Sequence, residues 1–312
     1  MLTFISNLDG AGSESASILK SVVLTTFALT AFAFNSILCR LALGTSSIDA
    51  SSFTSIRLLS GAATLLILYL IFRKPAEVGK PRGNWMSAGF LFGYAICFSF
   101  AYIGLTTATG ALILFGMVQA TMLIWAIGSG ERPTMLEWGG LIVAICGLVY
   151  LVFPGLKAPP LWSSTLMALA GVCWGFYTLR GKQSNDPLAD TSGNFLRTIP
   201  FVILAALPFL YQIDLSPVGI LYAILSGSIA SGIGYAVWYA ALEYHTATRA
   251  AILQLAVPAL AAIGGLIFLG ELISVRLVVA SSLILGGIGL SIIAKKRIRP
   301  SRNSQKDEST HS

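Results

Sequence analysis

The sequence predicts an all-α integral membrane protein in which ten transmembrane helices form two inverted five-helix repeats (5+5). Two observations carry this prediction. The chain is 55% hydrophobic and only 11% charged, with a mean hydropathy of +0.80, which is far more apolar than a soluble domain of 312 residues requires. The second observation is an internal repeat, because residues 18–156 are echoed about 140 positions later by residues 157–296.

The repeat is visible in the spacing of individual residues. Residues 34–40 and residues 174–180 each end in an arginine, and the two arginines are 140 positions apart. The same offset of 140 relates three further pairs: Arg57 with Arg197, Glu131 with Glu271, and Gly147 with Gly287. Internal halves of this size in an apolar chain are typical of transporters, so the duplication favours transport over catalysis.

The individual helices follow from the uncharged stretches. A spanning helix needs about 20 mostly apolar residues. Stretches without Asp, Glu, Lys, Arg or His cover residues 21–39, 58–72, 83–130, 138–156, 158–179, 198–213, 215–242, 250–270 and 277–294. The stretch 83–130 is long enough for two helices and is interrupted by the polar residues 106–110. Nine stretches therefore predict ten helices, five in each repeat.

A short polar segment is predicted at each end of the chain. We predict a polar N-terminal tail at residues 1–17, the two repeats at 18–156 and 157–296, and a basic, polar cytoplasmic tail at 297–312. The first helix is not expected to be a signal peptide, because residues 1–17 contain Asp9 and Glu14 but no Lys or Arg. The apolar run that follows is also too long for the hydrophobic part of such a peptide.

Basic residues predict the orientation. If the N-terminus is cytoplasmic, 16 of the 20 Lys and Arg residues lie on the cytoplasmic side, and only Arg40, Arg57, Lys157 and Arg276 lie outside. By the positive-inside rule both termini are then cytoplasmic, in a multi-pass protein of the plasma (inner) membrane. The basic tail could suggest nucleic-acid binding, but short clusters beside a last helix are more often membrane anchors. We expect the lipid bilayer as a partner and no nucleic acid.

An odd number of helices per repeat has a geometric consequence. The second repeat must enter the bilayer from the side opposite to the first, so the halves are related by a pseudo-two-fold axis in the membrane plane. Such an arrangement has two nearly equivalent packings, one open to each side. The sequence therefore predicts alternating access.

These residues resemble the EamA-type members of the drug/metabolite transporter superfamily. The resemblance covers residues 18–296 and rests on the ten short-looped helices, the duplication, Arg57 and Arg197, and the pairs 130–131 and 270–271, both Gly-Glu. Similar proteins export amino acids, other metabolites or drugs. The resemblance implies an exporter of small organic metabolites, amino acids or related amphipathic compounds.

Charged side chains within helices are costly in lipid and usually have a role. Six such residues are candidate structural or gating charges: Arg40, Arg57, Glu131, Arg180, Arg197 and Glu271. Glu271, Arg40 and Arg57 are predicted near the outer side of the membrane, so Glu271 can pair with Arg57 or Arg40. Glu131, Arg180 and Arg197 are predicted near the inner side, so Glu131 can pair with Arg197 or Arg180. Two alternatives stay open. The arginines could extend to the interface, and the glutamates could favour the positive N-termini of the helices that follow them.

Polar and aromatic residues near the middle of the helices are candidates for substrate binding. Inverted repeats place a site near the midplane, with equivalent helices of both halves contributing. The candidates are Asn35, Tyr94, Gln119, Trp174, Tyr177, Tyr235, Trp238 and Gln254. Amides within spanning helices also join helices to one another, and aromatic stripes also pack against neighbours or lipid. These structural roles are the alternative interpretation.

The sequence gives no support for catalysis or for a cofactor. Cys39, Cys97, Cys146 and Cys173 lie in apolar stretches without metal or redox spacing. The string from Gly175 to Lys182 has an arginine where a phosphate-binding loop needs its second glycine. We expect no catalytic residues, no metal and no cofactor. A membrane-embedded enzyme is the alternative from another class, and it would need a catalytic set that is not found.

Two further expectations concern transport itself. Nucleotide-sugar or sugar-phosphate carriers of the same superfamily are the alternative substrate class, but these need cations that converge at mid-depth. No Asp or Glu lies in the middle of a predicted helix, so we expect facilitated diffusion or exchange rather than proton coupling. A homodimer through the fifth and tenth helices is the assembly that the sequence leaves open.

Overall fold

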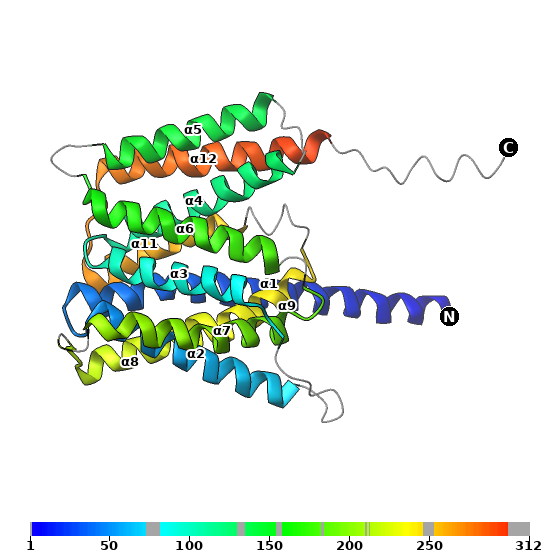
Figure 1. The fold of residues 1–312 in the computed structure, drawn as a ribbon. Coiled ribbons are helices and arrows are strands. Elements are labelled where there is room, and N and C mark those ends of the chain that lie inside the picture. Colours follow the sequence, from blue (N-terminus) through cyan, green and yellow to red (C-terminus); the bar gives the residue numbers. More distant parts are fainter. Residues whose placement is uncertain are drawn as a thin grey trace.

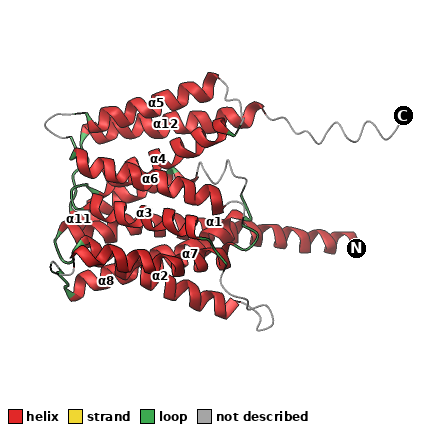
Figure 2. Cartoon of the chain, in the orientation of Figure 1, coloured by secondary structure: helices red, strands yellow, loops and turns green. Residues whose placement is uncertain are grey.

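The computed structural model describes residues 2–72, 82–129, 135–153, 158–181, 184–209, 211, 213–245 and 253–298. Throughout these residues the regular secondary structure is helical (Figure 2). The helices are α1 (Leu2–Gly44), α2 (Ala50–Phe72), α3 (Trp85–Tyr102), α4 (Thr107–Gly128), α5 (Met135–Val152), α6 (Leu161–Gly181), α7 (Pro187–Ala206), α8 (Pro217–Leu225), α9 (Gly234–Leu242), α11 (Ala256–Leu269) and α12 (Val275–Ile298). A short 3-10 helix, η2 (Leu207–Phe209), follows α7, and a π-helix, η3 (Ser226–Ile233), joins α8 to α9.

Six helical segments of the described residues are long and apolar enough to cross a membrane: residues 18–44, 50–72, 85–102, 107–126, 187–209 and 217–242. Shorter apolar helices cover residues 138–152, 256–269 and 275–290. The chain is therefore a multi-pass membrane protein with an all-helical fold.

Side-chain caps explain where several helices begin. Asn84 accepts a hydrogen bond from the backbone N–H of Ser87 and caps α3. Asp186 caps α7 and Ser216 caps α8, and each is followed by a proline in the first turn, where its missing N–H costs nothing. At its C-terminal end, α11 stops at Gly270, whose φ of 64° lies in the left-handed region that glycine adopts freely.

The helices lie side by side with their axes roughly parallel (Figure 1). At the centre, α6 packs against α3 and α4, while α2 contacts α7 and η3. The α5 and α12 helices pack on each other at one edge of the bundle. Helix α1 begins, and α12 ends, at the same end of the bundle, which we call the N-terminal end; the other is the far end.

Loop contacts occur in two corresponding places at opposite ends of the bundle. At the far end, the segment between α1 and α2 pairs with the segment before α8, through a bridge between Ile48 and Leu215 and a 3.0 Å hydrogen bond from Ser216 N to Ser47 O. At the N-terminal end, residues before α3 contact α7, where Gly83 N donates to Asp190 Oδ1 at 3.1 Å. At the far end, the loop after the first helix of one half meets the loop after the second helix of the other. At the N-terminal end, the loop after the second helix of the first half meets the first turn of α7, just after the loop that follows the first helix of the second half.

Two glycines that are 140 positions apart allow α5 and α12 to approach closely. A Cβ atom on Gly287 would lie 2.5 Å from the carbonyl oxygen of Gly140, and one on Gly147 would lie 2.8 Å from Cβ of Leu283. Small residues let membrane helices pack through their backbones. The homodimer through these two helices stays a prediction.

The structure differs from the sequence prediction at the N-terminus. Helix α1 begins at Leu2, so residues 2–17, predicted as a polar tail, are helical, while the apolar span of this helix begins at Ile18. The tail at 297–312 lies outside the described residues beyond Ile298. The π-helix η3 is a second difference, since the apolar pattern of residues 215–242 predicts one regular helix.

Candidate functional site

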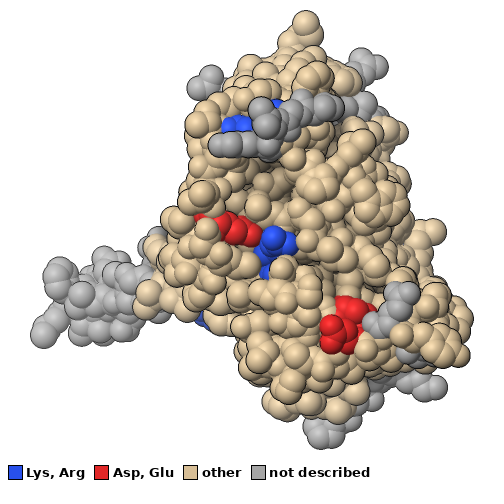
Figure 3. All heavy atoms as spheres, turned by 90° about the vertical axis from the view of Figure 1, so that its left-hand side faces the viewer, with Lys and Arg blue, Asp and Glu red and all other residues tan. Residues whose placement is uncertain are grey.

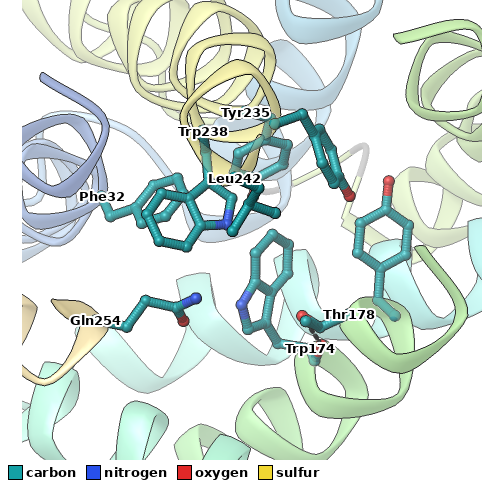
Figure 4. A pocket seen from close by; sticks show the side chains of 9 residues that line it. Phe32, Trp174, Thr178, Tyr235, Trp238, Leu242 and Gln254 are labelled. Carbon is teal, nitrogen blue, oxygen red and sulfur yellow. Dashed lines mark hydrogen bonds between the residues drawn. The ribbon is translucent and has the colours of Figure 1, made fainter. Parts of the chain in front are cut away.

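A small cavity of about 50 Å³ lies between helices from both halves of the chain, and the space rises to about 480 Å³ when the open region at its mouth is counted. Figure 4 shows its lining from α1, α6, α9 and the residues before α11. The lining residues are Phe32, Trp174, Tyr177, Thr178, Tyr235, Trp238, Tyr239, Leu242 and Gln254. Leu242 ends α9, and Thr178 is three residues from the end of α6. The cavity therefore lies in the half of the bundle nearer the N-terminal end.

Aromatic rings form most of the cavity wall. The ring of Trp174 stacks on Tyr177, with centroids 5.4 Å apart, and lies 5.0 Å from the ring of Tyr235. Phe32 meets both Tyr235 and Trp238 edge to face, each at 5.8 Å. Rings that contact one another in this way make an apolar surface.

Polar groups complete the lining. In Figure 4 the side chain of Gln254 points toward Trp174, and its amide can both donate and accept hydrogen bonds. The hydroxyl of Thr178 donates to the carbonyl of Trp174 in the preceding turn at 2.8 Å. Apolar walls with a few polar groups are typical of small-molecule sites.

Five of the eight residues predicted from the sequence line this cavity: Trp174, Tyr177, Tyr235, Trp238 and Gln254. Gln119 is half-buried on α4 and is not among the lining residues. The sequence prediction missed Phe32, Thr178, Tyr239 and Leu242. Thr178 and Tyr239 each follow a predicted residue by four positions, so the helical period could have found them.

Asn35 and Tyr94 belong instead to a buried polar network beside the cavity. Ser226 of η3 donates to Asn35 Oδ1 at 2.6 Å, and Asn35 Nδ2 donates to the hydroxyl of Tyr94 at 3.0 Å. The same hydroxyl accepts a 2.9 Å hydrogen bond from Nη2 of Arg57. Tyr94 also touches the cavity wall, because its ring lies 4.8 Å from that of Trp174. The network joins α1, α2, α3 and η3.

The structure corrects the predicted place of Arg57. Its position in the sequence predicts a side chain near the outer end of its helix, paired with Glu271 if paired at all. In the structure its side chain is 1% exposed and reaches Tyr94, the tenth of the 18 residues in α3. Within the described residues no Asp or Glu forms an ion pair with it. The guanidinium therefore lies at mid-depth, where the sequence analysis expected no cation.

Of the two partners predicted for Glu271, Arg57 and Arg40, the structure shows Arg40. Nε of Arg40 lies 3.4 Å from Oε1 of Glu271. Both carboxylate oxygens of Glu271 accept the backbone N–H of Thr107, at 3.0 and 2.8 Å, and Nη1 of Arg40 donates to the carbonyls of Tyr102 and Ile103. We call these five residues the Glu271 clasp. It ties α1, α3, α4 and the segment before α12 together at the far end.

The clasp also corrects the predicted capping role of Glu271. Thr107 is the first residue of α4, so the carboxylate satisfies the N-terminus of α4 and not that of α12. The start of α12 is capped by Ser274, which accepts the N–H of Leu277 at 3.1 Å. Figure 3 shows this end of the bundle: most of it is uncharged, and acidic and basic side chains touch near its centre.

The remaining predicted charges lie at the N-terminal end. Arg180 donates to Ser87 Oγ at 3.0 Å and to Asn84 Oδ1 at 3.1 Å. Arg197 donates to the carbonyls of Arg82 and Gly193. Glu131, the predicted partner of both arginines, lies outside the described residues.

The described part of the chain contains neither a metal-binding cluster nor a disulfide. Its His, Cys, Asp and Glu residues form no group of three that could hold a metal ion. All four cysteines are free thiols.

Comparison with known proteins agrees with a membrane transport fold. The EamA-like transporter family matches residues 161–293. An uncharacterized protein of Pseudomonas aeruginosa is 48% identical over 283 residues, which are 91% of this chain and 98% of that protein. The threonine/homoserine exporter RhtA of Escherichia coli is 28% identical over 55% of this chain and 59% of its own length. An uncharacterized transporter of Archaeoglobus fulgidus is 26% identical over 67% of this chain and 76% of its own length.

A solved crystal structure shares the fold. Its TM-score is 0.60 at 20% sequence identity, and the match covers 88% of this chain and 99% of the other.

Proposed function

The chain belongs to the EamA-like transporter family of the drug/metabolite transporter superfamily, and we propose that it exports small organic metabolites, amino acids or related amphipathic compounds, by alternating access. The observation that carries the proposal is the cavity between Trp174, Tyr235, Trp238 and Gln254. Its rings suit an apolar side chain, and its amide suits an amine, a hydroxyl or a carboxylate. Each such polar contact contributes about 1 kcal/mol.

The proposed architecture is a pair of inverted five-helix repeats, residues 18–156 and 157–296. Two findings support it. The loop contacts at Ile48 and Leu215, and at Gly83 and Asp190, correspond to each other but lie at opposite ends of the bundle. Gly147 and Gly287 hold corresponding places where α5 meets α12. A pseudo-two-fold axis in the membrane plane produces both relationships.

The proposed orientation has both termini in the cytoplasm of a cell whose plasma (inner) membrane the protein spans. Among the described residues, Lys20, Arg82 and Arg180 lie at the N-terminal end, while Arg40 and Arg276 lie at the far end. The excess of positive charge at the N-terminal end supports its assignment to the cytoplasm. The far end then faces outward.

The proposed mechanism is alternation between an inward-open and an outward-open packing. The Glu271 clasp joins four segments at the outward end, and the cavity lies nearer the cytoplasmic end. These positions fit a state that is closed to the outside and that receives substrate from the cytoplasm. Opening of the clasp would release substrate outward.

The substrate class draws on the aromatic cavity and on RhtA, a threonine/homoserine exporter. A nucleotide-sugar or sugar-phosphate carrier is the second candidate, because the mid-depth guanidinium of Arg57 favours an anionic ligand. A membrane-embedded enzyme is the candidate of another class. Purified protein in detergent would alter its substrate if it were an enzyme, whereas a transporter leaves the substrate unchanged.

The decisive experiment compares intracellular and extracellular metabolites, without preselection, in cells that do or do not overproduce the protein. We expect a small set of amphipathic metabolites to fall inside the cells and rise outside. A Trp174→Ala variant that is present in the membrane at normal level should abolish the change. Identical profiles with and without the protein would contradict export.

A further inference from the structure

A buried cation without a counter-ion lies one layer of side chains behind the cavity. The side chain of Arg57 is 1% exposed, and no described carboxylate pairs with it. Its Nε and Nη1 atoms are buried without a hydrogen-bond partner. Its contacts are one hydrogen bond, from Nη2 to the Tyr94 hydroxyl, and the rings of Phe98 and Tyr94, whose centroids lie 4.9 and 5.2 Å from Cζ.

These contacts do not compensate for burial. A guanidinium carries five N–H donors, and aromatic rings replace only part of the hydration that it loses in the membrane interior. A buried charge without a partner is costly, and inside a membrane such a residue usually belongs to a ligand site. Other arginines of the same bundle have charged or carbonyl partners. Arg197 donates to two carbonyls. Arg40 donates to two carbonyls through Nη1 and has Glu271 as a counter-ion, although its Nε, like that of Arg57, makes no hydrogen bond.

The neighbours of Arg57 connect it to the cavity. Tyr94, which holds Arg57, lies 4.8 Å from the ring of Trp174, and Trp174 lines the cavity. Trp174 in turn lies 5.0 Å from Tyr235. The rings of Tyr94, Trp174 and Tyr235 therefore form the layer between the guanidinium and the cavity, and a shift of these rings would join the two.

The helical segment that carries Tyr235 is irregular just before this residue. Tyr235 follows directly after the π-helix η3 and its cap, and π-helical turns often occur at functional sites because they hold an extra residue. Gly227 of η3 packs on the backbone of α2 at Arg57, since a Cβ atom there would lie 2.1 Å from the carbonyl oxygen of Arg57. Movement of η3 therefore acts on the arginine and on the cavity wall together.

We propose that Arg57 is the anchor for the carboxylate of the transported substrate, which binds its free Nε and Nη1 edge when the layer of Tyr94, Trp174 and Tyr235 opens. This inference rests on the proposed transport function and narrows its substrate class to carboxylates. A planar carboxylate accepts two parallel hydrogen bonds from a guanidinium. Gln254 and the faces of Trp174 and Trp238 then receive the rest of the molecule.

Charge favours a carboxylate over a phosphate ester. Arg57 is the one fully buried cation in the described part of the chain. Its single positive charge matches the single negative charge of a carboxylate, so no part of the carboxylate's charge is left buried and unpaired. A doubly charged phosphate ester would leave one negative charge buried and unpaired.

The experiment uses the full chain purified in detergent, with L-phenylalanine, L-threonine, the amide of each, and glucose 6-phosphate as probes. Binding is measured by the shift in melting temperature and by tryptophan fluorescence. We expect the wild type to bind at least one of the acids at least 10-fold more tightly than its amide, and to bind the phosphate ester weakly or not at all. Equal binding of acids and amides, preference for the phosphate ester, or binding of no acid would each overturn the proposal.

Variants separate a ligand role from a structural one. Arg57→Met keeps the volume of the side chain and removes the unsatisfied charge, so its melting temperature should equal or exceed that of the wild type while the preference for the acid is lost. Arg57→Lys should retain a reduced preference, because an ammonium lacks the planar fork. Should Arg57→Met fail to fold, the charge stabilises the fold and the proposal fails unless Arg57→Lys folds and shows the reduced preference.

Arg197→Met is the matched control at the equivalent place in the second half. Its guanidinium donates to two carbonyls, so its loss should lower the melting temperature and leave the preference for acids intact. An equal loss of preference in both variants would contradict a specific role for Arg57. Export distinguishes the failure of the carboxylate anchor from the failure of the transport function. Export only of metabolites that lack a carboxylate would overturn the anchor while transport stands, and absence of export would overturn the transport function.

Discussion

Glu271 and Arg40 are joined at the far end of the bundle by an Nε to Oε1 distance of 3.4 Å, and the same carboxylate caps α4 through the N–H of Thr107. One side chain therefore serves as counter-ion and as helix cap. The ion pair requires a negative charge at position 271, whereas the cap requires only a hydrogen-bond acceptor, so mutation can separate the two roles.

The clasp predicts unequal effects of two substitutions. Glu271→Leu removes both tasks and should cost about 2 kcal/mol of stability, whereas Glu271→Gln keeps one oxygen for Thr107 and should cost less. Thermal unfolding in detergent measures both. The double variant Arg40→Glu, Glu271→Arg should not recover wild-type stability, because it leaves Thr107 without an acceptor. Full recovery would mean that only the ion pair matters.

The cavity predicts different roles for two tryptophans of α6. Trp174 lines the cavity, whereas Trp162 is 72% exposed near the start of the same helix. Trp174→Ala and Gln254→Ala should reduce export at least 10-fold at a normal level of protein in the membrane, and Trp162→Ala should leave export within about two-fold of the wild type. Export by all three at the rate of the wild type would make these residues packing elements.

Two adjacent glycines of α12 predict opposite tolerance of a methyl group. At Gly287 a Cβ atom would lie 2.5 Å from the carbonyl oxygen of Gly140, whereas nothing lies within 4 Å of such an atom at Gly286. Gly287→Ala should destabilise the protein by about 1–3 kcal/mol, while Gly286→Ala should be neutral. Folded yield and melting temperature are the readouts. Equal tolerance at both positions would argue against close packing of α5 and α12.

Cysteine labelling tests the proposed orientation in the membrane. Thr45 is exposed at the far end and Asn185 is exposed at the N-terminal end. In a chain without its four native cysteines, a cysteine at Thr45 should react with an impermeant reagent from outside the cell, and one at Asn185 only after the membrane is opened. The reverse pattern would overturn the proposed orientation.

Energy coupling gives the last prediction. The described carboxylates, apart from those of the first 17 residues, lie at helix ends or in loops, so a relay of membrane-embedded acids is missing from the described part of the chain. We expect proteoliposomes to exchange or equilibrate substrate along its own gradient. Uphill accumulation driven only by an imposed pH gradient would contradict this expectation.

Most residues that line the cavity are predictable from the sequence, because an inverted repeat places a binding site on a few helices near the midplane. Trp174, Tyr235, Trp238 and Gln254 follow from that symmetry and from the helical period. The sequence does not predict the mid-depth place of Arg57, because depth is inferred from the position of a residue along its helix. A long side chain reaches beyond that position, and only packing against Tyr94 decides its direction.

Of the two roles of Glu271, the sequence predicts the ion pair but not the cap on α4. Its opposite charge and similar depth favoured an arginine partner, and Arg40 is that partner. Capping of α4 by Glu271 needs a contact between segments far apart in sequence, which no local pattern contains. The π-helix is also invisible to apolar periodicity, because an added residue within one turn changes neither composition nor length noticeably.

In the repeat that we propose, α3 is the counterpart of the segment formed by α8, η3 and α9, yet α3 is a regular α-helix throughout Trp85–Tyr102. Two identical halves would give the inward-open and outward-open packings equal free energy. The π-helix is present in only one half, so under the proposed mechanism the two packings are expected to differ in free energy. A difference of 1.4 kcal/mol already makes the ratio of the two populations about 10 to 1. Under the proposed alternating access, the unloaded carrier is therefore expected to have a resting side, to which this irregular helical segment contributes.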